Sequence, residues 1–357
     1  MSRPGAPKHA ERGFVLVLTL LVLVIVAIAA STFAEKVASA VELAQKSRQN
    51  TQTIIDMAAT RAEILYRLGT TSITMDGLGR GNTLVALDNR PYRGLGDTLV
   101  HLQDNRGLLN LNQTNDDRLL RFLGIMGIPA EQRSHLIDTL RDYIDADKLE
   151  HLNGAEEPQY LARQLVPPTN NYLTTPWEVR RIIGWRDAPQ LWQNSRFIDL
   201  TTTSTMGGLN PNTAPVEVLA TLPGMTEELA QTLVLQRQQA PIMHTGQLAA
   251  MAGIPEQLLD MQIMVLPSNS LRVTQSVPGL NWRQQYSVSL TPNGDQGPWR
   301  IDYFTRVSPP APVTANAGSS APAGAPSQAS SAPADIAPLP PRSTAAPETN
   351  PMLRFGG

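Results

Sequence analysis

The feature that most constrains this chain is an apolar run near its N-terminus. Residues 14–33 read FVLVLTLLVLVIVAIAASTF and contain no charged residue, glycine or proline. As a helix, about twenty residues rise roughly 30 Å, which is the thickness of the hydrocarbon core of a bilayer. The run therefore predicts a helix that crosses a membrane once.

A short basic leader precedes the apolar run and predicts its orientation. Residues 2–13 contain three basic residues against one acidic residue, namely Arg3, Lys8 and Arg12 against Glu11. Positive charge beside a span holds that side in the cytoplasm, so the rest of the chain is expected on the outer side. Two ordinary interpretations stay open. One is an uncleaved anchor, and the other is a secretory signal cleaved among the small residues at 27–31.

Gly13 followed by Phe14, directly before the apolar run, resembles the processing site of type IV prepilins. This resemblance implies that prepilin peptidase cleaves after Gly13 and methylates the amine of Phe14. Most pilin-like proteins have Glu as the fifth mature residue, whereas this chain has Leu18. In that family the Glu pairs with the terminal ammonium of a neighbouring subunit, because an unpaired charge in lipid is costly. In lacking this Glu, the chain resembles the K-type minor pseudopilins of type II secretion. That resemblance implies that the subunit lies at the filament tip.

The chain beyond the membrane run shows helical segments between two groups of strands. Glycine and proline are absent from 14–68, so the helix is expected to continue to Gly69. Alternating segments predict strands at TLVAL, DTLVHLQD and GLLNLN, and later at SLRVTQSV, WRQQYSVSLT and WRIDYFTRV. The expected fold is α+β: a type IV pilin-like long N-terminal helix and a small antiparallel sheet, with an inserted all-α, helix-hairpin domain.

These patterns predict six consecutive segments. They are a prepilin leader at 1–13, the transmembrane part of the helix at 14–34, the spine helix and first strands at 35–115, the inserted all-α domain at 116–267, the C-terminal strands at 268–307, and a disordered tail rich in Pro, Ala and Ser at 308–357.

Three expected helix junctions in the inserted segment share one sequence pattern, a Gly followed two residues later by Pro or Thr. They are Gly127-Ile128-Pro129, Gly224-Met225-Thr226 and Gly253-Ile254-Pro255. In each, Gly is expected to end one helix and Pro or Thr to begin the next. The middle junction lies in 209–237, which resembles the helix-hairpin-helix of DNA-binding proteins. However, Thr226 replaces their second glycine, and Arg237 is the only Lys or Arg between residues 209 and 264. Phosphate contacts need basic residues, so nucleic acid is not expected as a partner.

An acidic cluster lies in residues 141–160, with six carboxylates at Asp142, Asp145, Asp147, Glu150, Glu156 and Glu157. Crowded carboxylates repel one another unless a cation or solvent separates them. No EF-hand loop is present, and the spacing alone also fits a solvated, acidic helix end. The segment is similar to one in the helical domain of the K-type family, whose members bind calcium. That resemblance implies calcium ligands at Asp145, Asp147 and Glu156.

No enzyme is predicted from this sequence. The chain has no cysteine, which excludes thiolate metal sites, a cysteine nucleophile and disulfides. It also has no paired His motif of a zinc enzyme and no Gly-x-Ser-x-Gly motif. A formal net charge of −2 is not that of a general polyanion binder.

The resemblance to the K-type family implies a structural function. The chain would cap the tip of the type II secretion pseudopilus and initiate its assembly, supporting protein export across the outer membrane. The implied partners are the I- and J-type minor pseudopilins, the major pseudopilin, prepilin peptidase, and the secretin or exported substrates. The protein would sit in the inner membrane with its C-terminal part in the periplasm. Two alternatives stay open: a membrane-anchored helix-hairpin-helix DNA receptor, and a minor pilin of a type IV pilus.

Overall fold

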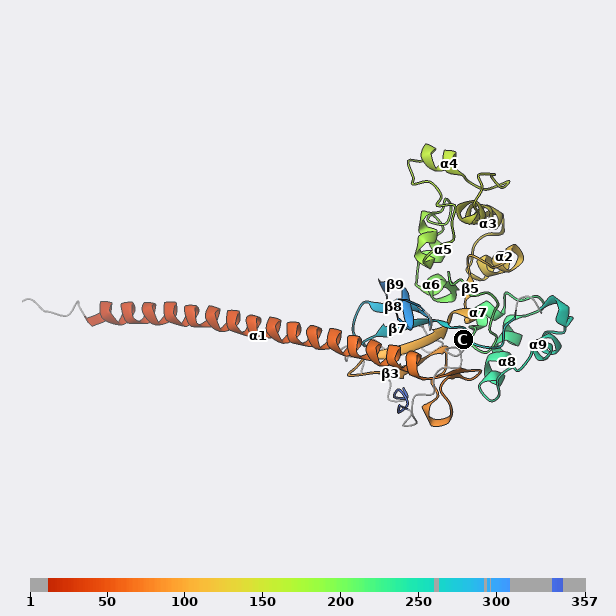
Figure 1. Ribbon diagram of the computed structural model, residues 1–357. Coiled ribbons are helices and arrows are strands. Elements are labelled where there is room, and N and C mark those ends of the chain that lie inside the picture. The colour runs from red at the N-terminus through yellow and green to blue at the C-terminus, as the bar shows by residue number, and fades with distance from the viewer. Residues whose placement is uncertain (1–11, 260–262, 292–293, 296, 309–335, 343–357) are drawn as a thin grey trace, which may run out of the picture. The chain divides into compact units, whose positions relative to one another are not determined.

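The computed structural model describes residues 12–259, 263–291, 294–295, 297–308 and 336–342 of the chain (Figure 1). Contacts within the chain define two compact units, Met1–Ile55 and Asp56–Gly357. Helix α1, Arg12–Thr70, contributes residues to both. The apolar run belongs to the first unit, whereas the strands and the other helices belong to the second.

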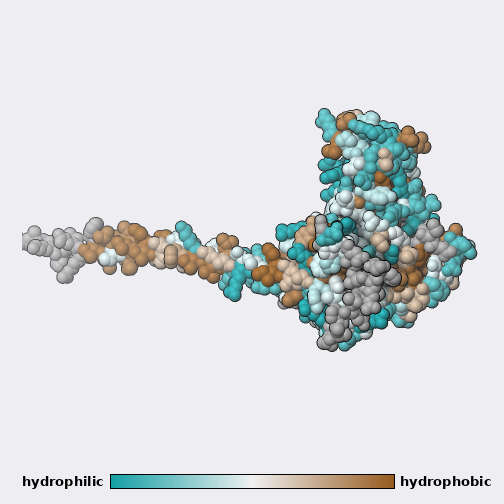
Figure 2. Space-filling view, in the orientation of Figure 1, coloured by the Kyte–Doolittle hydropathy of each residue, from teal (hydrophilic) through white to brown (hydrophobic). Residues whose placement is uncertain are grey.

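Helix α1 is uninterrupted because residues 14–68 contain no glycine or proline. It continues to Thr70, one residue past the expected stop at Gly69. All side chains from 15 to 52 are exposed, and Figure 2 shows brown, apolar residues along the part that follows the grey N-terminus. A helix that exposes apolar side chains all round needs lipid or other helices around it. Among the described residues, this one helix is long and apolar enough to cross a membrane, a property that a signal sequence shares.

The second unit is built on a five-stranded antiparallel sheet with the strand order β3-β4-β7-β8-β9. The strands are β3 (Asp88–Arg93), β4 (Leu99–Asp104), β7 (Ser270–Ser276), β8 (Arg283–Leu290) and β9 (Trp299–Val307). The last turns of α1 pack on this sheet, because Ile64 and Leu68 are fully buried in one cluster with Val100, Val273 and Tyr286. Two short strands, β1 (Ile73–Thr74) and β2 (Gly77–Leu78), form a separate hairpin.

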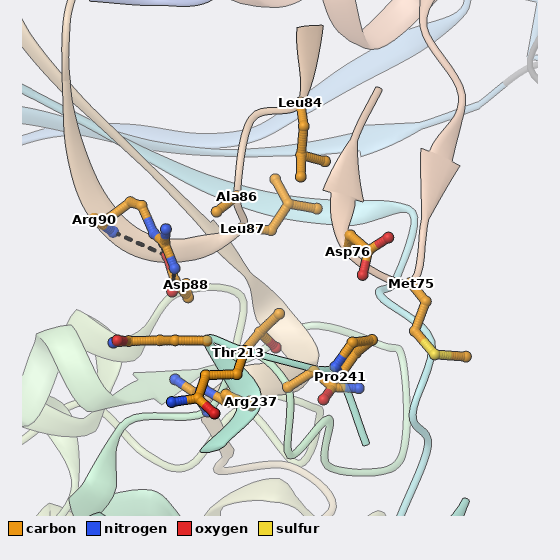
Figure 3. A pocket seen from close by; sticks show the side chains of 13 residues that line it. Met75, Asp76, Leu84, Ala86, Leu87, Asp88, Arg90, Thr213, Arg237 and Pro241 are labelled. Atoms are coloured by element: carbon orange, nitrogen blue, oxygen red, sulfur yellow. Dashed lines mark hydrogen bonds and ion pairs between the residues drawn. The ribbon is translucent and has the colours of Figure 1, made fainter. Parts of the chain in front are cut away.

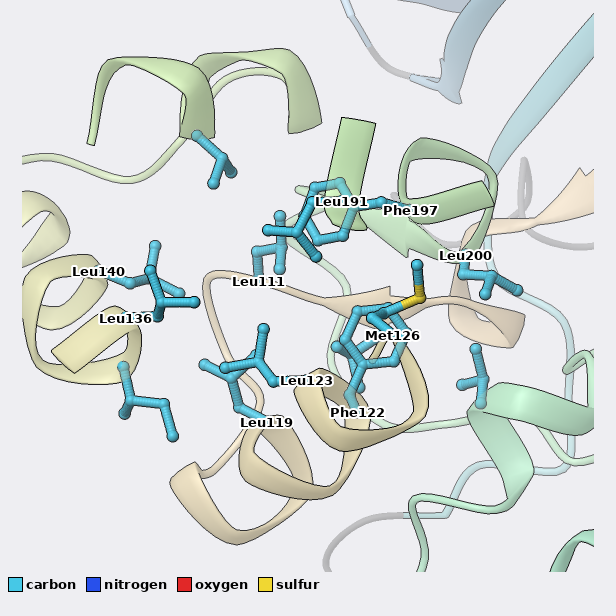
Figure 4. Close-up of a cluster of buried hydrophobic side chains, with 14 of the residues drawn as sticks. Leu111, Leu119, Phe122, Leu123, Met126, Leu136, Leu140, Leu191, Phe197 and Leu200 are labelled. Atoms are coloured by element: carbon cyan, nitrogen blue, oxygen red, sulfur yellow. The ribbon is translucent and has the colours of Figure 1, made fainter. Parts of the chain in front are cut away.

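The helical segment leaves the sheet after β4 and returns at β7, although these two strands are neighbours in the sheet. Its helices are α2 (Asp116–Ile125), α3 (Ala130–Ile144), α4 (Glu157–Ala162), α5 (Pro189–Trp192), α6 (Arg196–Leu200), α7 (Val216–Leu219), α8 (Glu227–Arg237) and α9 (Thr245–Ala252). Short 3-10 helices lie at η1 (Gly81–Thr83), η2 (Asn105–Gly107), η3 (Pro176–Arg181) and η4 (Glu256–Leu258). One apolar cluster fills the segment, and Figure 4 shows the part of it around Phe122 and Phe197. The ring centroid of Phe197 lies 6.1 Å from that of Phe122 and 5.9 Å from that of Trp185.

The helical segment also packs on the sheet through two arginines that reach α6. Arg272 on β7 donates to the carbonyl oxygens of Ile198 (2.7 Å) and Thr201. Arg283 on β8 forms an ion pair with Asp199 at 2.7 Å. Both guanidinium groups are largely buried, and each has the acceptors that a buried charge requires.

At two of the three Gly-containing junctions, Gly127 and Gly253, the glycine ends the preceding helix, as the sequence predicts, whereas α7 ends at Leu219 with Ala220 as its C-cap, so Gly224 does not end a helix. Gly127, Gly224 and Gly253 have positive φ angles of 82°, 65° and 66°, which glycine adopts without a steric cost. After the second junction, Thr226 caps α8 by accepting a hydrogen bond from the backbone of Leu229. A change of direction between helices is therefore encoded locally at each of these sites.

Two strand predictions are wrong in the first half of the chain. TLVAL, residues 83–87, forms only an isolated bridge between Val85 and Leu78. The actual edge strand β3 begins one residue after this segment and contains Pro91, a residue that is rare inside strands. Proline is tolerated there because an edge strand has one side without ladder partners. The third expected strand yields only β5 (Leu109–Asn110), which pairs in parallel with β6 (Thr201–Thr202) outside the large sheet.

The predicted disorder of the tail at 308–357 needs a correction. Most of that range, 309–335 and 343–357, lies outside the described residues. Residues 336–342 are described, and Pro338 forms a parallel bridge with Arg93 on β3. Part of the tail is therefore packed on the body, which its low-complexity composition does not suggest.

Candidate functional site

The residues predicted for processing lie near the start of α1. Gly13 and Phe14 belong to its first turn. Leu18 follows about one turn later and is 49% exposed. The hydroxyl of Thr19 donates to the carbonyl of Leu16 at 2.9 Å, so this polar group of the apolar run is satisfied within the helix, as lipid requires.

The acidic cluster is assembled at the end of α3 and the start of α4. Asp145 is the residue that follows the last turn of α3, and Glu156 is the residue that precedes α4. Ligand atoms of Asp142, Asp145 and His151 all lie within 4.8 Å of one another. Asp142 and Asp145 are three positions apart, so the helix places both on one face.

Asp142 is the structural centre of this cluster. Its side chain is fully buried and accepts hydrogen bonds from the backbone of His151 (3.1 Å) and of Ala155 (2.7 Å), and from the His151 ring. A Cβ added at Gly154 would lie 1.8 Å from an Asp142 oxygen, so the loop can close over this carboxylate only with glycine there. The sequence prediction did not select Asp142, although its spacing from Asp145 carried the signal.

Two predicted ligands have oxygen atoms that no group satisfies. Within the described residues, Oδ1 of Asp145 and Oε1 of Glu156 are buried and have no hydrogen-bond partner. A buried acceptor without a partner is costly, and a cation would supply the missing contact. The third predicted ligand, Asp147, is exposed, and its Oδ1 accepts a hydrogen bond from the backbone of Leu149 at 2.8 Å. The structure thus places the charges of Asp145 and Glu156 close enough to interact, with Glu156 buried and Asp145 half-buried, and leaves Asp147 exposed.

The electrostatics of the cluster agree with a site for positive charge. Burial and then the neighbouring charges of Asp147 and Asp142 raise the pKa of Asp145 above its ordinary value. Burial, followed by the charges of Asp142 and Asp145, also raises the pKa of Glu156. The hydrogen bond to Asp142 raises the pKa of His151. Neighbouring negative charge contributes to each shift after burial or the hydrogen bond, and a divalent cation would neutralise that charge.

The cluster also borders a cavity of about 500 Å³ at the surface. Asp145, His151, Asn170, Asn171 and Tyr172 are among the residues that line it. The side-chain amide of Asn170 donates to the carbonyl of Asp147 at 2.8 Å, which ties these two parts of the chain together. Carboxylate and amide oxygens are hard ligands, and this donor set fits calcium better than a soft transition metal.

A second polar centre lies where the helical segment joins β4. Asp104 is fully buried and accepts hydrogen bonds from the side chains of Asn210 (2.9 Å), Thr213 (3.0 Å) and Ser268 (2.7 Å), and from the backbone of Ser268 (3.0 Å). Asn212, between the first two, bonds the backbone of Ile242 through both ends of its amide. The segment Asn210–Thr213 therefore ties loops of the helical segment to the sheet.

A cavity of about 180 Å³ lies beside this junction, between β3 and the end of α8 (Figure 3). Three of the charged residues that line it, Asp88, Arg90 and Arg237, are engaged with partners inside the protein. Asp88 and Arg90 form an ion pair at 2.6 Å, and although burial opposes it, the contacts with Arg90 hold the pKa of Asp88 below its ordinary value. Arg237 donates to the carbonyl oxygens of Pro211 and Ala214, both at 2.6 Å. Burial lowers the pKa of Arg237 to about 10.

Arg237 bears directly on the DNA-receptor alternative. It is the only Lys or Arg between residues 209 and 264, and its guanidinium is bound to backbone carbonyls. The second position where DNA-binding hairpins have glycine is Thr226, which caps α8. The hairpin thus offers no basic side chain that is available to a phosphate, and phosphate contacts dominate nucleic-acid affinity.

Comparison with known proteins identifies two matching family models. Both describe type II secretion system protein K, and they match residues 98–193 and 209–265. Type II secretion system protein K of Klebsiella pneumoniae is 27% identical over 208 residues, which cover 51% of this chain and 60% of that relative.

A solved structure supports the fold. It is the crystal structure of the GspK-GspI-GspJ complex from the type 2 secretion system of enterotoxigenic Escherichia coli, with a TM-score of 0.50 and 17% identity. The match covers 74% of this chain and 99% of the matched chain. The α+β fold, with its long N-terminal helix, small antiparallel sheet and helical segment, is therefore shared with that structure. On these matches, two stretches of the chain, 98–193 and 209–265, are similar to the type II secretion system protein K family.

Proposed function

We propose that the chain is a minor pseudopilin that caps the tip of the type II secretion pseudopilus and initiates its assembly. The observation that carries this proposal is an apolar helix with Leu18 at the fifth position after Gly13, on a chain with two stretches similar to the protein K family. A subunit without a carboxylate at that position has nothing to neutralise the terminal ammonium of a subunit above it. It is therefore suited to the top position.

The proposed assembly begins with processing at the membrane. Prepilin peptidase cleaves after Gly13 and methylates Phe14, and the apolar part of α1 stays in the inner membrane with the second unit in the periplasm. The I- and J-type minor pseudopilins then join through stem packing in lipid, and the major pseudopilin follows below. The crystal structure with a similar fold is that of a GspK-GspI-GspJ complex. The secretin and exported substrates are the expected partners of the exposed end.

N-terminal sequencing of the protein purified from membranes tests the processing step. The expected product begins with methylated Phe14, and a Gly13→Ala variant should keep its leader and stay out of the assembled complex. A product that begins near Ser31, or one that starts at Met1, would refute the proposal. Photo-crosslinking from the exposed surface of the second unit should then yield I- and J-type partners but no subunit above it.

We also propose that the acidic cluster holds a calcium ion. Asp145 and Glu156 would ligate it through their unpartnered buried oxygens, and Asp147 would reach it from the surface. Asp142 would add negative charge and hold the loop that carries His151. The ion would join the end of α3 to the start of α4 and so make the helical segment rigid.

A further inference from the structure

The segment Ile336–Arg342 lies along the free edge of the sheet. Strand β3 is the outermost strand in the order β3-β4-β7-β8-β9. The backbone N–H of Arg93 donates to the carbonyl of Ala337 at 2.8 Å, and the N–H of Leu339 donates to the carbonyl of Arg93 at 2.9 Å. An edge strand presents unpaired backbone groups of this kind, and here the chain's own tail satisfies those of Arg93.

Side chains of α1 hold the same segment at its other end. Arg67 donates to the carbonyl of Pro340 at 2.6 Å. Glu63 accepts from Nε of Arg342 at 3.0 Å, and the Arg342 guanidinium lies 4.8 Å from the centre of the Tyr66 ring. The side chains of Glu63 and Arg67 are only 13% and 9% exposed, so these contacts are partly shielded from solvent.

The Glu63 carboxylate, which accepts from Arg342, is held in place by another residue of α1. Arg67 pairs with Glu63 at 2.8 Å and holds the carboxylate in place at the i,i+4 spacing. The hydrogen bond from Arg342, together with the contacts of Arg67, holds the pKa of Glu63 below its ordinary value despite burial. Glu63 is therefore a charged, oriented acceptor for a guanidinium.

One apolar side chain completes the contact. Leu339 packs against the cluster formed by Ile64, Leu68 and the sheet residues. Peptide recognition by strand addition combines backbone pairing to an edge strand with selective side-chain contacts, which here are the apolar contact of Leu339 and the ion pair of Arg342. The backbone bonds confer affinity for any extended chain, whereas the Leu and Arg contacts confer selectivity.

We propose that the β3 edge at Arg93, together with Glu63, Tyr66 and Arg67 of α1, is a peptide-binding site for an extended Leu-Pro-x-Arg sequence. Its resident ligand is the chain's own Leu339-Pro340-Pro341-Arg342. While this segment is bound, the backbone of Arg93 is occupied and no strand of another molecule can pair there. This inference rests on the contacts of the tail alone and is independent of the function proposed above.

The experiment uses the full-length chain in detergent and a fluorescent peptide that copies residues 335–343. In the double variant Leu339→Asp, Arg342→Ala the resident segment loses both selective contacts, so the site becomes available. The peptide should bind this variant saturably by fluorescence anisotropy. It should bind the unmodified chain at least tenfold more weakly, because the resident segment competes with it.

Matched variants separate this site from nonspecific binding. A peptide with Ala in place of its Arg should lose most of the affinity, as should the standard peptide when Glu63→Gln is added to the double variant. In the unmodified chain, Pro341→Ala should leave the site blocked, because Pro341 is an exposed residue of the segment. Equal binding to the unmodified chain and the double variant would overturn the proposal. So would the absence of saturable binding, or a Glu63→Gln variant that melts normally and binds the peptide unchanged.

Discussion

Asp104 shows how much of this structure depends on single buried polar residues. Its carboxylate receives hydrogen bonds from Arg106, Asn210, Thr213 and Ser268, which come from widely separated parts of the chain. Such a carboxylate is stabilising only while each of its donors is present. The same rule applies to Asp142, which is also buried and surrounded by donors.

Replacing Asp104 with Asn should destabilise the second unit by about 3 kcal/mol. The NH2 group of the new amide would face the N–H and O–H groups that now donate to the carboxylate, and these buried donors would lose their acceptor. Chemical denaturation of the full-length protein in detergent measures this loss. Asp97→Asn at an exposed position is the matched control and should change the free energy of unfolding by less than about 0.5 kcal/mol. Equal stability of the two variants would mean that the network contributes little.

Leu18→Glu should impair secretion without unfolding the second unit. The new carboxylate would stand in the apolar run, where an unpaired charge costs about 3 kcal/mol, and it would allow another subunit to stack above. Leu18→Ala is the control and should support secretion normally. The measurements are the amount of exported protein and the thermal melting of the second unit. Normal secretion by Leu18→Glu would contradict the proposed role of this position.

At the scale of elements, the helix junctions depend on glycine for two different reasons. Gly224 and Gly253 share positive φ angles of 65° and 66°. A Cβ at Gly224 would lie 2.5 Å from a methyl of Ile254, whereas one at Gly253 would have no atom within 4 Å. Backbone conformation is thus common to both sites, and close packing is specific to one.

This difference predicts unequal effects of the same substitution. Gly253→Ala should cost about 1 kcal/mol, which is the strain of a left-handed residue with a side chain. Gly224→Ala should cost about 1 to 2 kcal/mol more, because Ile254 must also move. Urea titrations of both variants give the two values. A Gly224→Ala variant as stable as Gly253→Ala would show that Ile254 relaxes freely.

The elements also differ in how far their sequences predict them. Strands β7, β8 and β9 were predicted nearly to the residue, because β-rich segments are separated there by turn residues. Strand β3 was missed, because Pro91 and neighbouring polar residues lack that pattern. Its position at the sheet edge, which is a tertiary property, makes the proline acceptable.

At the scale of the whole molecule, the calcium proposal connects ligand binding with stability. The raised pKa values of Asp145 and Glu156 mean that, without an ion, the folded state binds the protons of these two carboxyl groups more tightly than the unfolded state does. The stability that the two protonated groups contribute to the fold is therefore fullest below the ordinary carboxyl pKa. It is lost as the pH rises through the raised values. A cation reverses this loss, because it binds the deprotonated form.

Thermal melting with calcium or with a chelator should therefore differ more as the pH rises from 4 to 7. With calcium at a hundred times its dissociation constant, the melting temperature should rise by roughly 5 °C at neutral pH. Asp145→Asn should abolish this rise, whereas Asp147→Asn should reduce it less, because Asp147 is exposed. Identical melting curves with calcium and chelator at pH 7 would exclude a stabilising calcium site.

The sequence by itself determined the features that depend on neighbouring residues. A long run without glycine or proline makes α1 helical wherever it lies, and the junctions at Gly127 and Gly253 end helices through local backbone conformation. Only the tertiary structure decided the features that join distant residues. It buried Asp142 and left Asp147 exposed, gave Asp104 its donors, and placed residues 336–342 against β3. The physical reason is that burial and hydrogen-bond satisfaction depend on what packs around a residue, and residues a hundred or more positions away supply much of that packing.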